Sequence, residues 1–295
     1  VEAKSVREGC INRKRDLRFL EQKGEMQATL NISGSTKVFG CISDPITHVR
    51  APSVFNPLFE KHGIDAVMVP LHVPASGLSD FIKGLRMMPN FGGMSITLPH
   101  KVPIMEFCDE IGHQGKLVGA VNYAAFDKNR RLIADNCDGS GFVSGLLAAG
   151  YQVARRKILM VGAGGAARAI AFSLADSGVS HLSIANRTES TAKELANSVI
   201  NAYPNIEIDC APPDPRGFDI VINTTSLGLN ESDNLPFDPE LLISSQIVAE
   251  IIMNPEETRI LKAAQKVGCN IHYGRPMFDH QVAIQAKLFG YNINI

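Results

Sequence analysis

The sequence lacks three features that would each have indicated a particular partner or compartment. Its 29 Lys and Arg residues nearly balance its 30 Asp and Glu residues, so neither nucleic acid nor an acidic membrane surface is expected as a partner. No apolar run approaches the roughly 18 residues that cross a bilayer, so no membrane partner is predicted. Its six cysteines show neither a CxxC motif nor zinc-site spacing, which favours reduced thiols in the cytoplasm and no bound metal.

What is present is enough apolar sequence for a large core. Apolar residues make up 45% of the 295 positions, a length and composition typical of two globular domains that act on a small molecule. From Lys37 onward, short apolar runs alternate with stretches of helical period, which predicts α/β layers around a largely parallel sheet. We expect the first strands at 38–42, 66–70, 94–98, 121–126 and 132–134, and the first helices at 52–62, 76–88, 103–108 and 142–149.

The first part of the chain has a different character. Residues 1–25 carry scattered charged side chains and no sustained apolar period. We therefore expect a disordered leader over residues 1–33, with translation or the folded domain beginning near Met26. An amphipathic targeting segment is the alternative, although such segments are poor in acidic residues and this stretch is not.

A glycine-rich turn between a strand and a helix marks the second half of the chain. The apolar run 157–161 leads directly into Gly162-Ala163-Gly164-Gly165-Ala166-Ala167 and then into an Ala-rich helix. Glycines there permit a tight turn and let the backbone approach a pyrophosphate, which N–H groups at the helix N-terminus stabilise. The pattern predicts dinucleotide binding, with a purely structural turn as the alternative.

The end of the next strand distinguishes NADP from NAD. Residues 181–185 run into Asn186-Arg187-Thr188, at the place where NAD enzymes usually present Asp or Glu to the ribose. A guanidinium there suits a 2′-phosphate, because forked, charge-assisted hydrogen bonds recognise such groups well. We expect NADP as the cofactor; Glu189 leaves NAD open, and a solvated surface Arg is the alternative for Arg187.

Two charged residues precede the glycine turn in separate motifs. Lys101 closes Ser95-Ile96-Thr97-Leu98-Pro99-His100-Lys101, and Asp138 lies within Asp135-Asn136-Cys137-Asp138-Gly139. A Lys and an Asp on turns can provide the proton transfer that accompanies hydride transfer. The two residues are therefore the candidate catalytic pair, against the alternative of a solvated Lys at a helix start.

Taken in order, these motifs resemble those of the shikimate dehydrogenase family, including its quinate/shikimate and shikimate-dehydrogenase-like members. The resemblance covers nearly everything from Lys37 to Gly290. Each motif is weak alone, but the ordered set is specific. The matching blocks are 40–56 (family G-x-P-I-x-H-S-x-S-P-x-x-H-N), 95–101 (N-V-T-x-P-x-K), 119–122 (G-A-V-N), 135–139 (D-N-T-D-G), 162–167 (G-A-G-G-A-A), 186–188 (N-R-T), 223–229 (N-A-T-S-x-G-M) and 274–281 (G-x-x-M-L-x-x-Q).

The resemblance implies an N-terminal α/β substrate domain at 34–140, a C-terminal Rossmann-like domain at 141–273, and a last helix within 274–295 that packs back on the first domain. It implies a monomer or homodimer that oxidises a cyclic polyol, with Lys101 transferring the proton and Asp138 orienting it. Thr97, Asn122 and Gln281 would hydrogen-bond the ring hydroxyls. The implied cofactor-binding residues are Gly162, Gly164, Gly165, Ala166, Asn186, Arg187, Thr188, Thr225, Met253 and Gly274.

One departure from the family pattern concerns the substrate. The family's two carboxylate-binding serines in H-S-x-S-P are Val49 and Ala51 here, in His48-Val49-Arg50-Ala51-Pro52. Because alternate residues of an extended segment share a face, we expect Arg50 to point away from the site. Losing two hydrogen bonds to a charged group weakens carboxylate binding by about 10²- to 10⁴-fold. We therefore predict poor activity on shikimate and preference for a less acidic or differently substituted cyclic alcohol.

Smaller departures accompany it. Met253 replaces the Tyr of the family's D-x-x-Y-N-P, and Thr191 stands where a second basic residue often contacts the 2′-phosphate. Cys137 replaces Thr, which we interpret as a tolerated small residue. The alternatives to a shikimate-dehydrogenase-like enzyme are an authentic shikimate dehydrogenase, a non-catalytic nucleotide-binding regulator of the same fold, and a methylenetetrahydrofolate-dehydrogenase-like protein.

Overall fold

The computed structural model describes residues 31–47 and 49–293. The chain divides into two compact units, Val1–Gly34 and Ser35–Ile295. The second unit contains all the helices and strands described below. Most of the expected leader, with Met26, and also His48 lie outside the described residues.

The first sheet of this unit orders its strands β2-β1-β3-β5-β6-β4. β1 pairs in parallel with β2 and β3, whereas β5 runs antiparallel to both β3 and β6. The sheet is therefore mixed, as a largely parallel α/β layer can be. Its strands are β1 (Lys37–Ser43), β2 (Ala66–His72), β3 (Phe91–Ile96), β4 (Glu110–Ile111), β5 (Tyr123–Phe126) and β6 (Leu132–Asp135).

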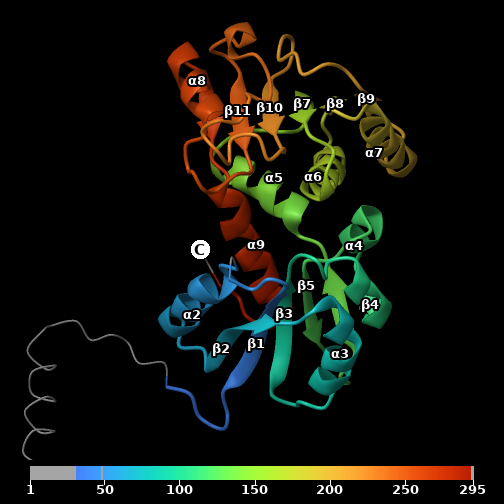
Figure 1. The fold of residues 1–295 in the computed structure, drawn as a ribbon, viewed down its shortest axis with the longest axis vertical. Helices are drawn as coiled ribbons and strands as arrows, with labels where there is room; N and C mark the ends of the chain where they lie inside the picture. Colours follow the sequence, from blue (N-terminus) through green and yellow to red (C-terminus); the bar gives the residue numbers. More distant parts are fainter. Residues whose placement is uncertain (1–30, 48, 294–295) are drawn as a thin grey trace, which may run out of the picture. The chain divides into compact units, whose positions relative to one another are not determined.

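Side chains of β1 alternate between two apolar clusters, as the period of a strand requires. Phe39 and Cys41 pack with residues of α2 (Ala51–Lys61), whereas Ile42 packs with residues of α3 (Leu78–Arg86). The two helices thus cover opposite faces of the first sheet (Figure 1). Its remaining helices are η1 (Ala75–Gly77), η2 (Pro103–Phe107) and α4 (His113–Val118).

The second sheet is parallel throughout, in the order β12-β11-β10-β7-β8-β9. Strand order reverses between β7 and β10, and dinucleotides bind at such a reversal, beyond the carboxyl ends of the strands. The strands are β7 (Lys157–Val161), β8 (His181–Ala185), β9 (Glu207–Asp209), β10 (Ile220–Asn223), β11 (Ile247–Glu250) and β12 (Asn270–His272). The helices are α6 (Gly165–Asp176), α7 (Glu189–Ala202), η3 (Pro239–Leu241) and α8 (Arg259–Val267).

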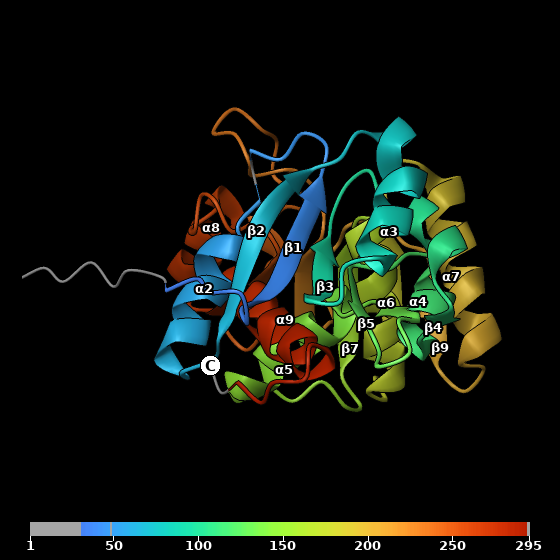
Figure 2. The same cartoon turned by 90° about the horizontal axis from the view of Figure 1, so that it is seen from below.

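Two helices connect the sheets and pack against each other. α5 (Asp138–Ala148) follows the first sheet, and α9 (Arg275–Leu288) returns from the second. Both lie between the sheets (Figures 1 and 2). Just beyond α9, the ring of Phe289 contacts Phe39 at 4.7 Å and Phe55 at 5.6 Å between centroids. The residue that follows α9 is thereby packed against the first sheet, while the boundaries 34–140, 141–273 and 274–295 stay predictions.

Some expected element bounds were wrong. α5 begins at Asp138, not Phe142, because the Gly141 amide already donates to the Cys137 carbonyl at 2.9 Å. The small polar residues of that first turn carry no apolar period, so the pattern missed it. β5 begins at Tyr123, not Val121, because the Val121 amide donates to the Lys101 carbonyl at 2.8 Å outside the ladder. No helix in the described ranges is long and apolar enough to span a membrane.

Candidate active site

The predicted catalytic pair meets where the turn after β3 faces the start of α5. The Lys101 ammonium donates to Asp138 Oδ2 at 2.7 Å, and the Asn122 amide donates to Asp138 Oδ1 at 2.8 Å. Asp138 is the first residue of its helix, where the helix dipole stabilises a negative charge. The side chains of Lys101 and Asp138 are 25% and 10% exposed, so the ammonium is both paired and reachable.

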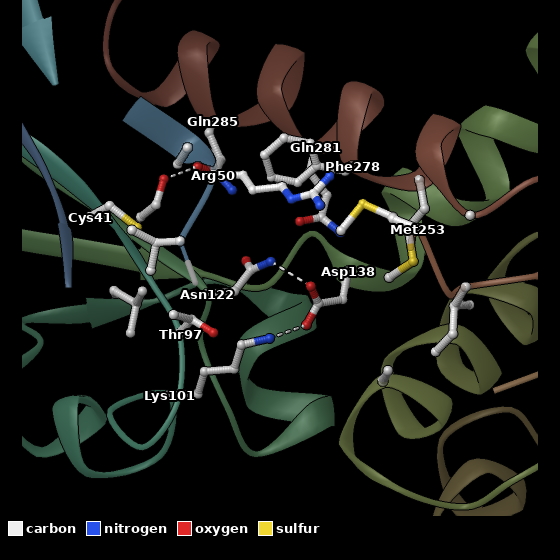
Figure 3. A pocket seen from close by; sticks show the side chains of 18 residues that line it. Cys41, Arg50, Thr97, Lys101, Asn122, Asp138, Met253, Phe278, Gln281 and Gln285 are labelled. Carbon is white, nitrogen blue, oxygen red and sulfur yellow. Dashed lines mark hydrogen bonds and ion pairs between the residues drawn. The ribbon is translucent and has the colours of Figure 1, made fainter. Parts of the chain in front are cut away.

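The pair opens into a cavity of about 340 Å³ between the two sheets. Figure 3 shows Lys101, Asn122 and Asp138 on one side of it, with Phe278, Gln281 and Gln285 of α9 across from them. All five predicted substrate positions contribute to the lining: Val49, Ala51, Thr97, Asn122 and Gln281. Three predicted cofactor positions do so as well: Ala166, Met253 and Gly274.

Arg50 corrects one expectation, because it lines the cavity instead of pointing away. The segment is not extended there: Arg50 caps α2 with φ −112° and ψ −16°, so the alternation of a strand does not apply. Its side chain is directed toward Phe278 and Gln281 (Figure 3). Arg50 also borders a second cavity of about 300 Å³, which shares Met253 and Phe278 with the first. Within the described part of the chain, no carboxylate pairs with it.

The glycine turn has the geometry that a dinucleotide requires. Gly162 has φ +118°, and a side chain there would collide with the Thr224 hydroxyl. A Cβ at Gly164 or Gly165 would meet no atom within 4 Å, and both glycines are exposed, so a ligand can approach the start of α6, whose first amides lack partners within the helix. Free amides at a helix start suit a pyrophosphate. The residues present therefore fit the diphosphate of a dinucleotide.

The other predicted cofactor residues lie away from the cavity, along the carboxyl edge of the second sheet. Asn186, Arg187 and Thr188 follow β8, with Thr188 capping α7, and Thr225 follows β10. Arg187 is exposed, whereas the nearby Glu189 pairs with Lys193 at 2.6 Å. This pairing offsets the negative charge of Glu189, and no carboxylate of the described residues pairs with Arg187.

Sequence reasoning missed a buried carboxylate that fixes the loop after β11. Glu250 is fully buried. Its Oε1 accepts from the amides of Ile251 and Ile252 at 2.8 and 3.1 Å, and its Oε2 accepts from Asn223 and Thr258 at 2.9 and 3.1 Å. Burial raises the pKa of this carboxyl, and the hydrogen bonds oppose the rise. Glu250 thus anchors the segment that carries Met253 to the cavity.

Sequence reasoning also missed Ser95, Phe278 and Gln285, which line the cavity. Gln285 lies four residues after Gln281 on α9, so helical spacing places both on one face; that spacing could have indicated it. Ser95 belonged to a recognised block but replaces its Asn. In the described residues, no group of three His, Cys, Asp or Glu side chains could hold a metal ion.

Comparison with known proteins identifies the family. The sequence model of the shikimate dehydrogenase substrate binding domain matches residues 41–123, and that of shikimate / quinate 5-dehydrogenase matches residues 147–230. The NADP-dependent shikimate dehydrogenase of Bacillus mycoides is 37% identical over 258 residues, 86% of this chain and 92% of the relative. This chain belongs to the shikimate dehydrogenase family. The predicted family and fold class are confirmed, and the protein is an NAD(P)-dependent oxidoreductase.

Two solved structures with similar folds are named for different substrates. The 5-ketofructose reductase of Gluconobacter sp. strain CHM43 is 32% identical, with a TM-score of 0.82 over 88% of this chain and 95% of that one. Shikimate 5-dehydrogenase of Listeria monocytogenes, in complex with shikimate and NAD, is 28% identical, with a TM-score of 0.83 over 89% and 95%. This fold is therefore shared with a protein named for 5-ketofructose and with one named for shikimate.

Proposed function

We propose that this protein transfers a hydride reversibly between NADP(H), or alternatively NAD(H), and a hydroxyl-bearing ring carbon of a shikimate- or quinate-like cyclic compound. The observation that supports this most directly is the Lys101–Asp138 pair. It opens into a cavity whose wall also includes Ala166, Met253 and Gly274, the positions implied for the cofactor. The relatives that are named as shikimate dehydrogenases act on a small cyclic substrate.

The side chains have separate roles in this proposal. When bound, the nicotinamide cofactor supplies the hydride acceptor or donor. Lys101 Nζ takes or gives the proton at the substrate oxygen, and positioned proton transfer contributes about 10²- to 10⁴-fold to a rate. Asp138 holds the ammonium in place through the 2.7 Å contact. Thr97, Asn122 and Gln281 bind the other ring hydroxyls.

The cofactor proposal rests on two features along the edge of the second sheet. The first amides of α6, next to the exposed Gly164 and Gly165, receive the diphosphate, and the exposed Arg187 receives the 2′-phosphate of NADP. Thr191 adds no second positive charge there, which keeps NAD as the alternative. That the protein is a monomer or homodimer, and that it is located in the cytoplasm, both stay predictions.

For the substrate, we propose a compound without a carboxylate at the shikimate position. Val49 and Ala51 line the cavity but carry no hydrogen-bond donor on their side chains. Met253, in the same cavity, is apolar as well. The Gluconobacter relative is named for 5-ketofructose, a neutral keto sugar, so a fold of this kind accommodates an uncharged substrate.

Arg50 supports a second candidate, an acidic substrate bound in a different way. Its guanidinium lines both cavities and pairs with no carboxylate among the described residues. An unpaired guanidinium binds carboxylates well through its forked donors. In that case the acidic group would extend toward the second cavity, which Arg50 also borders.

Matched acid and ester probes decide between the two candidates. Shikimate, quinate and their methyl esters are assayed with NADP⁺ and NAD⁺, using the wild type and Arg50→Ala. We expect the esters to equal or exceed the acids in kcat/KM, with little effect of Arg50→Ala. Acids favoured by the wild type but not by Arg50→Ala would establish the second candidate. Shikimate turnover at micromolar KM with ordinary kcat and no dependence on Arg50 would refute the substrate proposal.

A further inference from the structure

A row of buried polar side chains leads from the floor of the cavity to the catalytic carboxylate. The row consists of Ser95, Gln285, Cys137, Asn122 and Asp138. Taken over the whole residue, their exposed fractions range from 0% for Cys137 to 7% for Ser95 and Asp138. Ser95 and Gln285 also line the cavity, and Figure 3 shows Gln285 at its wall. The row therefore connects β3, α9 and the start of α5.

In every hydrogen bond of the row, the donor lies on the side of Ser95 and the acceptor on the side of Asp138. The Ser95 hydroxyl donates to Gln285 Oε1 at 2.5 Å, and Gln285 Nε2 donates to Cys137 Sγ at 3.7 Å. The Cys137 thiol donates to Asn122 Oδ1 at 3.4 Å, and Asn122 Nδ2 donates to Asp138 Oδ1 at 2.8 Å. Such a head-to-tail series ends on a charged acceptor, and successive hydrogen bonds polarise one another in a buried environment.

The thiol can act as a donor because it keeps its proton. Burial raises the pKa of Cys137 far above neutral pH, and the nearby Asp138 adds to the rise. The backbone amide of Cys137 also donates to Asn122 Oδ1, at 2.9 Å. Two donors on one oxygen fix which end of the Asn122 amide faces Asp138. Gln285 in turn holds the sulfur.

Both partners of Gln285 are positions at which this chain departs from the family motifs. Ser95 replaces the Asn of N-V-T-x-P-x-K, and Cys137 replaces the Thr of D-N-T-D-G. A Ser side chain is shorter than Asn, and Gln285 from α9 supplies an amide that contacts both substituted positions. Gln285 thus links the two substituted positions, Ser95 and Cys137, in one hydrogen-bonded row.

We propose that Gln285 and Ser95 are positioning residues that act through Cys137 and Asn122 to hold the Asp138 carboxylate toward Lys101 during proton transfer. This inference rests on the proposed function, because it concerns the same pair of catalytic residues. It assigns a role to the C-terminal helix beyond that of Gln281: Gln285 orients the acid–base machinery without touching the reacting oxygen.

Single substitutions in the row test its role kinetically. Gln285→Met and Cys137→Ala remove donors, Cys137→Ser restores one, and Gln265→Met on the exposed side of α8 is the matched control. The probe is oxidation of methyl shikimate by NADP⁺, with and without deuterium at the carbon being oxidised. We expect Gln285→Met and Cys137→Ala to lower kcat about tenfold and raise the isotope effect on kcat. KM for NADP⁺ should stay within about twofold, and Cys137→Ser should recover most of the rate.

A second measurement does not need turnover. The infrared S–H stretch of Cys137, assigned by its loss in Cys137→Ala, should shift in Gln285→Met and stay unchanged in Gln265→Met. An unshifted band, or a fall in kcat with an unchanged isotope effect, would overturn the inference. If the wild type oxidises none of the acid or ester probes, the proposed function is wrong, and the S–H band alone then decides whether the row exists.

Discussion

The aromatic contacts at the end of α9 lead to a prediction that separates stability from catalysis. Phe289 is 9% exposed and packs against Phe39 and Phe55 of the first sheet and its helix. Phe289→Ala leaves a cavity there, and substitutions of this kind cost about 3–5 kcal/mol. Because Phe289 anchors the helix end nearest Gln285, we expect a local loosening of the cavity wall in addition to the global loss.

The matched control is Phe172→Ala. Phe172 is 1% exposed and lies in the core of the second sheet, so its truncation should lower the free energy of unfolding by a similar amount. Urea unfolding measures the stability of both variants, and kcat/KM for methyl shikimate is measured at 25 °C without urea. We expect about a tenfold loss for Phe289→Ala and less than twofold for Phe172→Ala, with KM for NADP⁺ unchanged in both. Equal losses of activity in the two variants would refute the reasoning, since the effect would then follow stability alone.

Three further predictions concern the catalytic pair, the cofactor and pH. Lys101→Met should lower kcat by about 10²- to 10⁴-fold with NADP⁺ affinity intact, whereas the exposed control Lys116→Met should not. Unreduced turnover in Lys101→Met would exclude Lys101 as the proton-transfer group. Arg187→Ala should raise KM for NADP⁺ at least about tenfold and leave KM for NAD⁺ unchanged, and equal effects on both would exclude 2′-phosphate recognition. Burial lowers the pKa of His272 to about 4 from 6.5. Its contribution to stability is therefore present above pH 6.5 and lost as pH falls toward 4. Urea unfolding at a series of pH values should show that the free energy of unfolding falls less between pH 6.5 and 4 in His272→Phe than in the exposed control His62→Phe.

The sequence predicted the parts of the site that belong to continuous motifs. Lys101 and Asp138 were identified because each lies in a short continuous block, and the glycine turn was identified because the strand and the helix flank it directly. The expectation for Arg50 was wrong because the direction of its side chain depends on where α2 begins. That start is set by the turn preceding Pro52 and not by the alternation of side chains along a strand. Gln285 and Glu250 were missed because their roles come from partners on other elements; Gln285 and Ser95 are 190 positions apart.

That separation of 190 positions has a consequence for how the protein is made. The first sheet can pair all its strands once residue 135 has been synthesised, yet the wall that α9 contributes does not exist until residues 275–288 have left the ribosome. A nascent or cleaved chain ending between the second sheet and α9 would hold both members of the catalytic pair and still lack the amide that contacts Ser95. Enzyme activity would therefore report on completion of the whole chain more strictly than secondary structure or cofactor binding does.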